Sequence, residues 1–221
     1  GRVLTVGESV SGFSTGDKVG WVQVAGSYSQ RHLIPQDKAI LLPDGIDTST
    51  AAALLLQGLT AHYLAVDTFP LEPGHGCLIH AGAGGVGLLL TQMAELRGAE
   101  VFTTVGSSDK ANLSKAAGAD HVIVYTEESF RESIEAIAGP HRIDVVYDGV
   151  GATTFDGGLD LLRVRGLMVS FGNASGPPPE ISPLTMAEKG SIFLTRPTMA
   201  HYLLTREELI GRAQDLFAWV K

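Results

Sequence analysis

A run of glycines between an apolar strand and an apolar helix is the part of this sequence best suited to chemistry. Leu78 and Ile79 lead into His80-Ala81-Gly82-Ala83-Gly84-Gly85-Val86-Gly87, which contains the pattern GxGxxG. The first glycine of this pattern allows a tight turn, the second lets a pyrophosphate approach the backbone, and the third lets helix pack on strand. Free amides at the helix N-terminus then face the anion. The run predicts a dinucleotide site, because the Lys and Ser/Thr of a triphosphate-binding loop do not follow it.

The end of the next predicted strand bears on which dinucleotide is bound. An NAD site usually places an acidic side chain there, on the ribose 2′-hydroxyl. This chain has Ser107, Ser108 and Lys110 instead, which offer hydroxyl donors and a positive charge to a 2′-phosphate. The residues therefore predict NADP(H). The alternative is that a serine only caps the next helix and that Lys110 is a solvated charge, and Asp109 adds a charge of the opposite sign.

Two other patterns are weaker on inspection. His75, Cys77 and His80 are residue types that bind zinc, but strand alternation puts His80 on the opposite face from the other two. The segment Gly7–Ser11 lacks the final glycine of a serine-hydrolase elbow and does not lie between a strand and a helix. We therefore expect neither a metal site nor a serine hydrolase.

The elements around the glycine run alternate between short apolar strands and helices. We expect strands at 77–80, 101–105, 121–124, 145–147, 167–171 and 192–194, and helices at 86–96, 109–116, 130–138, 155–162, 183–189 and 205–220. Fully apolar strands in this alternation indicate a parallel sheet covered on both faces. The expected fold class is a doubly wound α/β sheet. Residues 1–43 read instead as short strands at 2–6, 19–24 and 29–34, followed by one or two helices up to about residue 67.

The amino-acid composition limits the kinds of binding partner that we expect. The 221 residues carry 16 Lys and Arg against 24 Asp and Glu, a net charge of −8, which argues against nucleic acid or an anionic membrane surface. The longest unbroken apolar stretch, Ala51–Leu56, is far shorter than a membrane span, and the first residues show no secretion signal. The single Cys77 excludes a disulfide framework. We expect a cytoplasmic protein without a membrane or nucleic-acid partner.

Several stretches together resemble the quinone oxidoreductases, the zeta-crystallin-like, zinc-free branch of the medium-chain dehydrogenase/reductase superfamily. The resemblance spans essentially the whole chain. It rests on Val10–Val19, Leu41–Gly45, Gln57–Ala61, His80–Leu89, Lys115–Tyr125, Asp144–Gly151, Gly166–Gly176 and Leu194–Pro197.

The resemblance implies two domains. An incomplete GroES-like substrate domain would comprise residues 1–58, with 201–221 returning to it, and a Rossmann-type NADP(H) domain would comprise 59–200. It also implies further sequence before Gly1 and after Lys221, where part of the substrate pocket would lie. A homodimer would form through the edge strand near Ser191–Leu194.

The resemblance also assigns roles to single residues. Arg196 would point into the substrate cleft as the catalytic residue, and Leu194 would meet the nicotinamide amide through its backbone. The cofactor NADPH would be bound by Thr60 at the nicotinamide, by the pyrophosphate loop, by three residues around the 2′-phosphate and by two strand ends. The last three groups are Ala83, Gly84, Gly85, Val86 and Gly87, then Ser107, Lys110 and Tyr125, then Val150, Gly151, Phe171, Gly172 and Asn173.

The expected function is zinc-independent, NADPH-dependent reduction of quinones. An acceptor that tolerates negative charge suits a span in which no proton donor is evident. Two alternatives stay open at this point. One is an enoyl or activated-alkene reductase of the same superfamily, and the other is a non-catalytic NADPH-binding protein, either a sensor or a crystallin-like structural protein.

Overall fold

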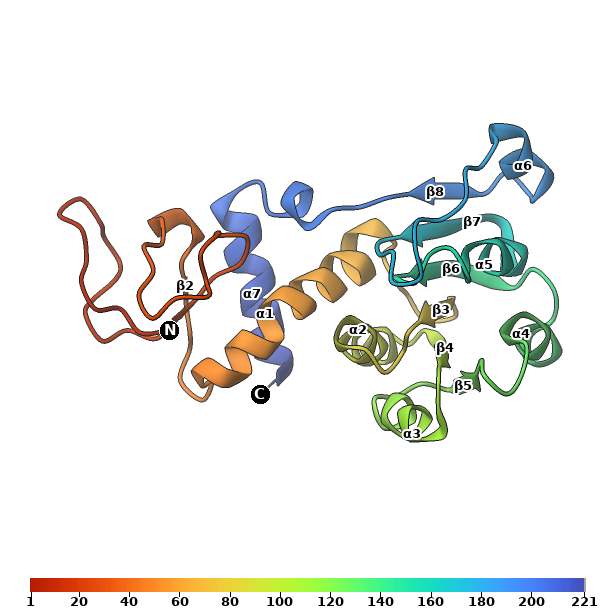
Figure 1. Ribbon diagram of the computed structural model, residues 1–221, viewed down its shortest axis with the longest axis horizontal. Helices are drawn as coiled ribbons and strands as arrows, with labels where there is room; N and C mark the ends of the chain where they lie inside the picture. Colours follow the sequence, from red (N-terminus) through yellow and green to blue (C-terminus); the bar gives the residue numbers. More distant parts are fainter. Residues whose placement is uncertain (221) are drawn as a thin grey trace. The chain divides into compact units, whose positions relative to one another are not determined.

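The computed structural model describes residues 1–220, which form two compact units. One unit comprises residues 1–60 and the residues from 199 onward, and the other comprises Ala61–Thr198. The larger unit contains a six-stranded parallel sheet in the order β5-β4-β3-β6-β7-β8 (Figure 1). Its strands are β3 (Gly76–His80), β4 (Glu100–Val105), β5 (His121–Val124), β6 (Ile143–Asp148), β7 (Leu162–Ser170) and β8 (Phe193–Thr195). With the first of these strands in the middle, the order is that of a Rossmann fold, and the predicted doubly wound sheet is confirmed.

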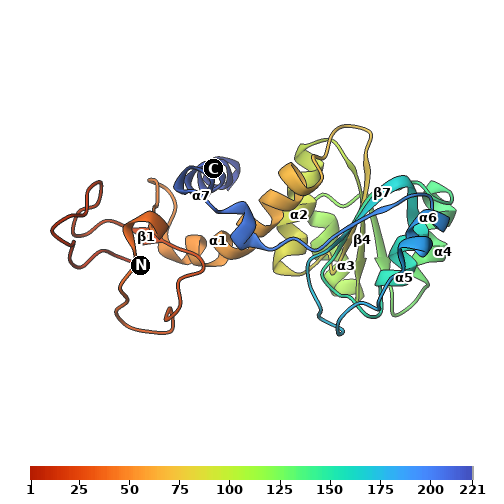
Figure 2. The same ribbon diagram turned by 90° about the horizontal axis from the view of Figure 1, so that it is seen from above.

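Helices cover both faces of this sheet. The helices α2 (Gly85–Leu96) and α3 (Ser108–Ala116) lie on one face, and α4 (Phe130–Ala138) and α5 (Phe155–Leu161) lie on the other (Figures 1 and 2). A short helix, α6 (Pro183–Glu188), precedes β8. The apolar side chains on the α4/α5 side form a buried core that includes Leu78, Phe102, Ile134, Val146 and Leu159. Burial on both faces explains why the strands read as unbroken apolar runs.

Tyr147 ties the central strands to a helical segment earlier in the chain. Its ring is fully buried in β6, and its hydroxyl donates to the carbonyl oxygens of Leu64 at 3.2 Å and Phe69 at 3.3 Å. Leu64 is the first residue of the π-helical segment η2 (Leu64–Thr68), and Phe69 follows its last residue. Burial raises the pKa of Tyr147 well above its usual value, so the phenol stays protonated and remains a donor.

The smaller unit has little regular sheet. It contains β1 (Val19–Gly20) and β2 (Ile40–Leu41), which pair antiparallel, the 3₁₀ turns η1 (Gln36–Lys38) and η3 (Met199–Tyr202), and the helix α7 (Arg206–Val220). It also contains the helix α1 (Thr48–Tyr63) up to Thr60. α1 and α7 pack closely, since a Cβ on Gly58 would lie 3.1 Å from both Cδ atoms of Leu216. The strands predicted at 2–6 and 29–34 are wrong. Residues 29–34 form a loop, and only Arg2 makes an isolated bridge, to Lys18, because an extended segment becomes a strand only beside a partner.

One helical stretch has the length and composition of a membrane span. Residues 48–68, which comprise α1 and η2, contain an 18-residue window with a mean hydropathy of 1.2, and 56% of that window is buried. The core helix of a soluble protein meets the same criteria. The sequence does not show this stretch as one unbroken apolar run, because polar side chains such as Gln57 and His62 interrupt it.

Candidate functional site

The turn after β3 brings the N-terminus of α2 to the carboxyl edge of the sheet. Gly84 is the N-cap of α2, and no side chain caps the helix there. Gly84 and Gly85 are exposed, while Ala83 and Val86 are half-buried. Since the first amides of a helix have no intrahelical acceptor, this turn presents N–H donors and the positive end of the helix dipole to solvent. An anion such as a pyrophosphate fits this arrangement.

Two glycines of the turn are required by close contacts. A Cβ on Gly87 would lie 2.3 Å from the carbonyl oxygen of Ala81, and one on Gly82 would lie 2.6 Å from Cβ of Thr103. The turn itself is closed by Gly84 N donating to Ala81 O at 2.8 Å. Ala81 has a φ of 56°, in the left-handed region, which an alanine rarely adopts and which its residue type does not predict. Gly82 and Gly87 therefore hold the helix against the strands, as the GxGxxG pattern predicts.

Three predicted 2′-phosphate residues gather at the ends of β4 and β5. Ser107 is the N-cap of α3, and its Oγ accepts from Lys110 N at 3.4 Å. Lys110 and Tyr125 are both exposed, and the Tyr125 hydroxyl lies 2.7 Å from where a Cβ on Gly106 would stand. Ser107 thus does cap the helix, which was the alternative reading of this residue. A cap and a phosphate ligand are compatible, because a hydroxyl that accepts from a backbone amide still has a proton to donate.

Asp148 organises the turn after β6, and sequence reasoning overlooked it. Its Oδ1 accepts from Val150 N at 2.7 Å, from Gly151 N at 3.0 Å and from the Thr154 hydroxyl at 2.9 Å. The carboxylate thereby fixes two predicted cofactor residues, Val150 and Gly151. An aspartate that ends an apolar strand and precedes glycine is the signal that could have identified it.

The loop after β7 is bound to the turn after β6. Phe171 N donates to Asp148 O at 2.8 Å, and a Cβ on Gly172 would lie 2.3 Å from Gly149 O. Gly176 N donates to Asn173 O at 3.0 Å and closes the loop. The predicted residues Phe171, Gly172 and Asn173 therefore lie beside Val150 and Gly151.

Arg196 joins the chain after β8 to the same loop. One of its terminal nitrogens, Nη1, donates to Ser170 O at 2.9 Å, to Ser170 Oγ at 3.2 Å and to Gly172 O at 3.0 Å. Leu194, within β8, pairs with Met168 and packs against the apolar core. Arg196 holds the loop after β7 in place, which is a role that the resemblance did not imply.

Thr60, also a predicted cofactor residue, lies in the smaller unit. It ends that unit's first segment, residues 1–60, and its hydroxyl donates to Leu56 O at 2.8 Å within α1. Its assignment to the nicotinamide pocket stays a prediction.

His75 and His80 make other contacts through Nδ1, and Cys77 is buried, so none of these three residues is available as a metal ligand. His75 Nδ1 accepts from Glu72 N at 3.1 Å, and His80 Nδ1 lies 2.9 Å from Thr104 Oγ1. Cys77 is fully buried in β3, and burial raises the pKa of its thiol, which disfavours the thiolate that binds metals. Within residues 1–220, no group of three His, Cys, Asp or Glu side chains is arranged to hold a metal ion.

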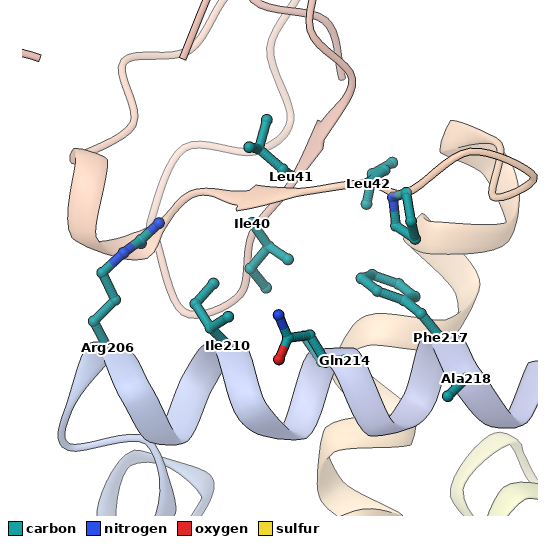
Figure 3. Close-up of a pocket in the computed structure, with 10 residues that line it drawn as sticks. Ile40, Leu41, Leu42, Arg206, Ile210, Gln214, Phe217 and Ala218 are labelled. Carbon is teal, nitrogen blue, oxygen red and sulfur yellow. The ribbon is translucent and has the colours of Figure 1, made fainter. Parts of the chain in front are cut away.

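A groove of about 610 Å³ lies within the smaller unit, between β2 and α7 (Figure 3). Its walls are mainly apolar and include Ile40, Ile210 and Phe217. Arg206, at one end, donates through Nη1 to the carbonyl oxygens of Gln36 at 2.9 Å and Ala39 at 3.1 Å. None of the predicted site residues lines this groove, and its side chains are not suited to redox chemistry.

Comparisons with known proteins agree with this description. Residues 85–219 match the family model described as zinc-binding dehydrogenase. A quinone oxidoreductase of Salmonella typhimurium is 45% identical over 221 residues, which are 100% of this chain and 68% of that protein. A 2-haloacrylate reductase of Burkholderia sp. is 38% identical over 226 residues, covering 99% of this chain and 67% of that protein.

A solved structure gives the same result. The Escherichia coli quinone oxidoreductase complexed with NADPH has a TM-score of 0.96 and 43% identity to this chain, and the match covers 100% of this chain and 68% of that one. The match therefore includes the glycine turn and both strand-end loops described above. This chain belongs to the quinone oxidoreductase family of the medium-chain dehydrogenase/reductase superfamily.

Proposed function

We propose that this chain binds NADPH at the carboxyl edge of the parallel sheet and uses it to reduce quinones. One observation carries the proposal. The glycine turn after β3 and the two joined loops after β6 and β7 lie on either side of the point where the strand order reverses, between β3 and β6. In open α/β sheets this crevice is where ligands bind.

The residues at this edge fit the parts of NADPH. The uncapped N-terminus of α2 would receive the pyrophosphate, and Ser107, Lys110 and Tyr125 would surround the 2′-phosphate. The phosphate seat has no acidic side chain at the residue that ends β4, which is Val105. A ribose 2′-hydroxyl would lack its usual carboxylate partner there, which favours NADPH over NADH.

When bound, NADPH supplies a hydride, so the protein's own work is binding and orientation. The loops after β6 and β7 would hold the nicotinamide end through Val150, Gly151 and Phe171–Asn173. Arg196, with Nη1 on that loop, would fix its position and bring a positive charge near a reduced, anionic acceptor. A quinone suits such a site because it delocalises the negative charge that it gains.

Calorimetric titration with NADPH and NADH, followed by assays of quinone-dependent NADPH oxidation, tests this proposal. We expect tighter binding of NADPH, and we expect Lys110→Ala to reduce that preference by about tenfold or more, since a charge-assisted contact contributes about 1.5–3 kcal/mol. Lys115→Ala, an exposed lysine in the last turn of the same helix, is the matched control and should leave it unchanged. Equal affinity for both nucleotides would contradict the phosphate seat. Binding without turnover would instead support the sensor or crystallin-like alternative.

Reduction of an activated alkene is a second candidate reaction. The 38% identity to a 2-haloacrylate reductase favours it, because that substrate class is an alkene conjugated to a carboxylate. Hydride addition to such an alkene leaves a carbanion that must gain a proton, whereas a quinone accepts the charge on oxygen. Parallel assays with a quinone and with a haloacrylate, each with saturating NADPH, distinguish the two by their kcat/KM values.

The reaction would be independent of zinc and would take place in the cytoplasm. Buried Cys77 is the only cysteine, and the chemistry of a thiol with a raised pKa does not suit a zinc ligand. One cysteine and an acidic composition also suit the reducing cytoplasm. Activity that survives exhaustive dialysis against a chelator would support zinc independence, and its loss with recovery on added zinc would contradict it.

A homodimer would form through the free edge of β8. This strand ends the sheet order, and Phe193 within it is 58% exposed. An open edge strand with an apolar side chain favours pairing with a second copy. Light scattering after size exclusion should give twice the chain mass, and Phe193→Lys should give the monomer. A wild-type monomer would contradict this assembly.

A further inference from the structure

A row of buried polar residues crosses the sheet near the carboxyl ends of its central strands, at the last residue of three of them and the last but one of β4. His80 of β3 pairs with Thr104 of β4, and Asp148 of β6 pairs with Ser170 of β7. The pairing of Ile79 with Tyr147, extended by one residue, puts His80 beside Asp148. All four residues are buried, although strand interiors in this sheet are otherwise largely apolar. Such a row has to satisfy its own hydrogen bonds.

His80 lies in the middle of this row, between Thr104 and Asp148. Its exposed fraction is 1%, and the ring packs edge-to-face on Phe130 of α4 at a centroid distance of 5.0 Å. Nδ1 lies 2.9 Å from the Thr104 hydroxyl, on the β4 side of the ring. Nε2 lies 3.7 Å from where a Cβ on Gly158 of α5 would stand, and that same Cβ would lie 3.2 Å from Val146 of β6. Nε2 is therefore on the β6 side.

Asp148 is the charged neighbour on that side. Its Oδ1 already accepts three hydrogen bonds, from Val150 N, Gly151 N and the Thr154 hydroxyl, which are partners typical of an ionised carboxylate. Its Oδ2 is buried and has no hydrogen-bond partner among the described residues, and the same is true of His80 Nε2. Two buried polar atoms without hydrogen-bond partners thus belong to adjacent residues of neighbouring strands, although no hydrogen bond or ion pair joins them.

Only one neutral form of the imidazole suits these neighbours. A ring with its proton on Nδ1 would turn a lone pair toward the carboxylate, and two buried electron-rich atoms would face each other. A ring with its proton on Nε2 turns an N–H toward Asp148 and lets Nδ1 accept from the Thr104 hydroxyl. Burial lowers the pKa of His80 to about 4, while the charge of Asp148 acts in the opposite direction, so the ring is neutral at physiological pH.

We propose that His80 is a positioning residue for the nicotinamide end of the cofactor site, held as the neutral Nε2–H tautomer between Thr104 and Asp148. It touches neither cofactor nor substrate. The dipole of its Nε2–H bond acts electrostatically on the buried charge of Asp148, whose carboxylate fixes Val150 N and Gly151 N and so sets the turn after β6. The effect on cofactor binding rests on the proposed function, whereas the tautomer does not depend on it.

The first experiment reads the tautomer directly, by ¹⁵N–¹H long-range correlation spectra of the imidazole rings in the whole chain. His80→Gln assigns the signal, and we expect the Nε2–H pattern with no titration between pH 5 and pH 8. In Asp148→Asn the neutral amide removes the preference, so we expect the Nδ1–H form to become populated. A wild-type Nδ1–H pattern, or a ring that titrates near pH 6.5, would overturn the inference whether or not NADPH binds.

The second experiment tests positioning through NADPH affinity. Glutamine at position 80 keeps an acceptor and a donor, whereas leucine keeps neither. We expect His80→Leu to weaken NADPH binding by about tenfold, as for one lost hydrogen bond, and His80→Gln to stay within about threefold of the wild type. Equal losses in both variants would overturn the positioning role. If the wild type itself does not bind NADPH, the proposed function fails and the tautomer result still stands.

Discussion

The carbonyl oxygen of Ala81 stands 2.3 Å from the position that a Cβ on Gly87 would take. Real Cβ atoms do not approach an oxygen this closely, so a side chain at residue 87 would push α2 away from the turn after β3. The backbone of Gly82 would also be only 2.9 Å from that Cβ. The third glycine of the pattern thus fixes the distance between helix and strand.

Replacing Gly87 with alanine should therefore damage both the fold and the site. We expect Gly87→Ala to lower the free energy of unfolding by about 1–3 kcal/mol through overpacking and to weaken NADPH binding at the displaced amides. Denaturant unfolding and calorimetry measure the two effects. Gly211→Ala in α7 is the matched control, because a Cβ there meets nothing within 4 Å. In that variant the free energy of unfolding should rise by up to about 1 kcal/mol, because alanine has a higher helix propensity than glycine. A similar rise in Gly87→Ala would contradict the close approach of Gly87 to Ala81.

Two serine caps separate a structural role from a ligand role. Ser107 caps α3 and belongs to the proposed phosphate seat, while Ser129 caps α4 in the same way, accepting from Glu132 N at 3.5 Å. We expect Ser107→Ala and Ser129→Ala each to cost about 1 kcal/mol of stability. Only Ser107→Ala should also weaken NADPH binding, measured at a temperature where both variants are folded. Unchanged NADPH affinity in Ser107→Ala would show that Ser107 only caps α3 and does not bind the phosphate.

Arg196 should act on the cofactor as well as on the substrate. Because Nη1 of Arg196 holds Ser170 and Gly172, Arg196→Met should loosen the loop after β7 and raise the Kd of NADPH while it lowers kcat. We expect each change to be about threefold to tenfold, as for lost hydrogen bonds at an exposed residue. Arg142→Met, an exposed arginine just before β6, is the control. A change in the KM for quinone with the NADPH Kd unaltered would show that Arg196 contacts the substrate only.

Acid should destabilise this protein partly through His80. The pKa of His80 is lowered to about 4 by burial, from an ordinary value of 6.5, with the opposing charge of Asp148 beside it. Between these values the unfolded chain binds the proton and the folded chain does not, so stability falls as the pH falls from about 7 to about 4. At about 1.4 kcal/mol per unit, the loss approaches about 3 kcal/mol. Unfolding at several pH values in the wild type and in His80→Gln measures it, and identical slopes would refute it.

The regular part of the fold could be read from the sequence because local pattern and tertiary burial agree there. β5 and α4 begin and end at the predicted residues, since turn residues and apolar periodicity mark both of their ends. The predicted strand at 167–171 misses the first residues of β7, because Arg163 and Arg165 interrupt the apolar pattern there. Arg165 adopts a φ of 61° in an irregular stretch that still pairs with β6. β1 begins at the predicted residue Val19 but ends at Gly20, and no strand was predicted at β2, because such short strands depend on partners rather than on pattern.

The candidate site divides in the same way. The glycine turn is visible in the sequence because backbone geometry demands glycine at Gly82 and Gly87. The hydrogen bonds from Phe171 N to Asp148 O and from Arg196 to Ser170 and Gly172 join residues of different strands and their loops, and no local pattern reports them. That His80 lies beside Asp148 cannot be predicted from local sequence either, because it depends on the order of the strands in the sheet.

That strand order also governs when the site can appear during synthesis. β3 leaves the ribosome first, but its neighbour β6 is the third strand to follow it, and β7 comes later still. When only the glycine turn has left the ribosome, one side of the crevice is present. The other side cannot form until the residues through Asn173 have been synthesised. We therefore expect nucleotide to stabilise the growing polypeptide only late in translation, when sheet and crevice close together.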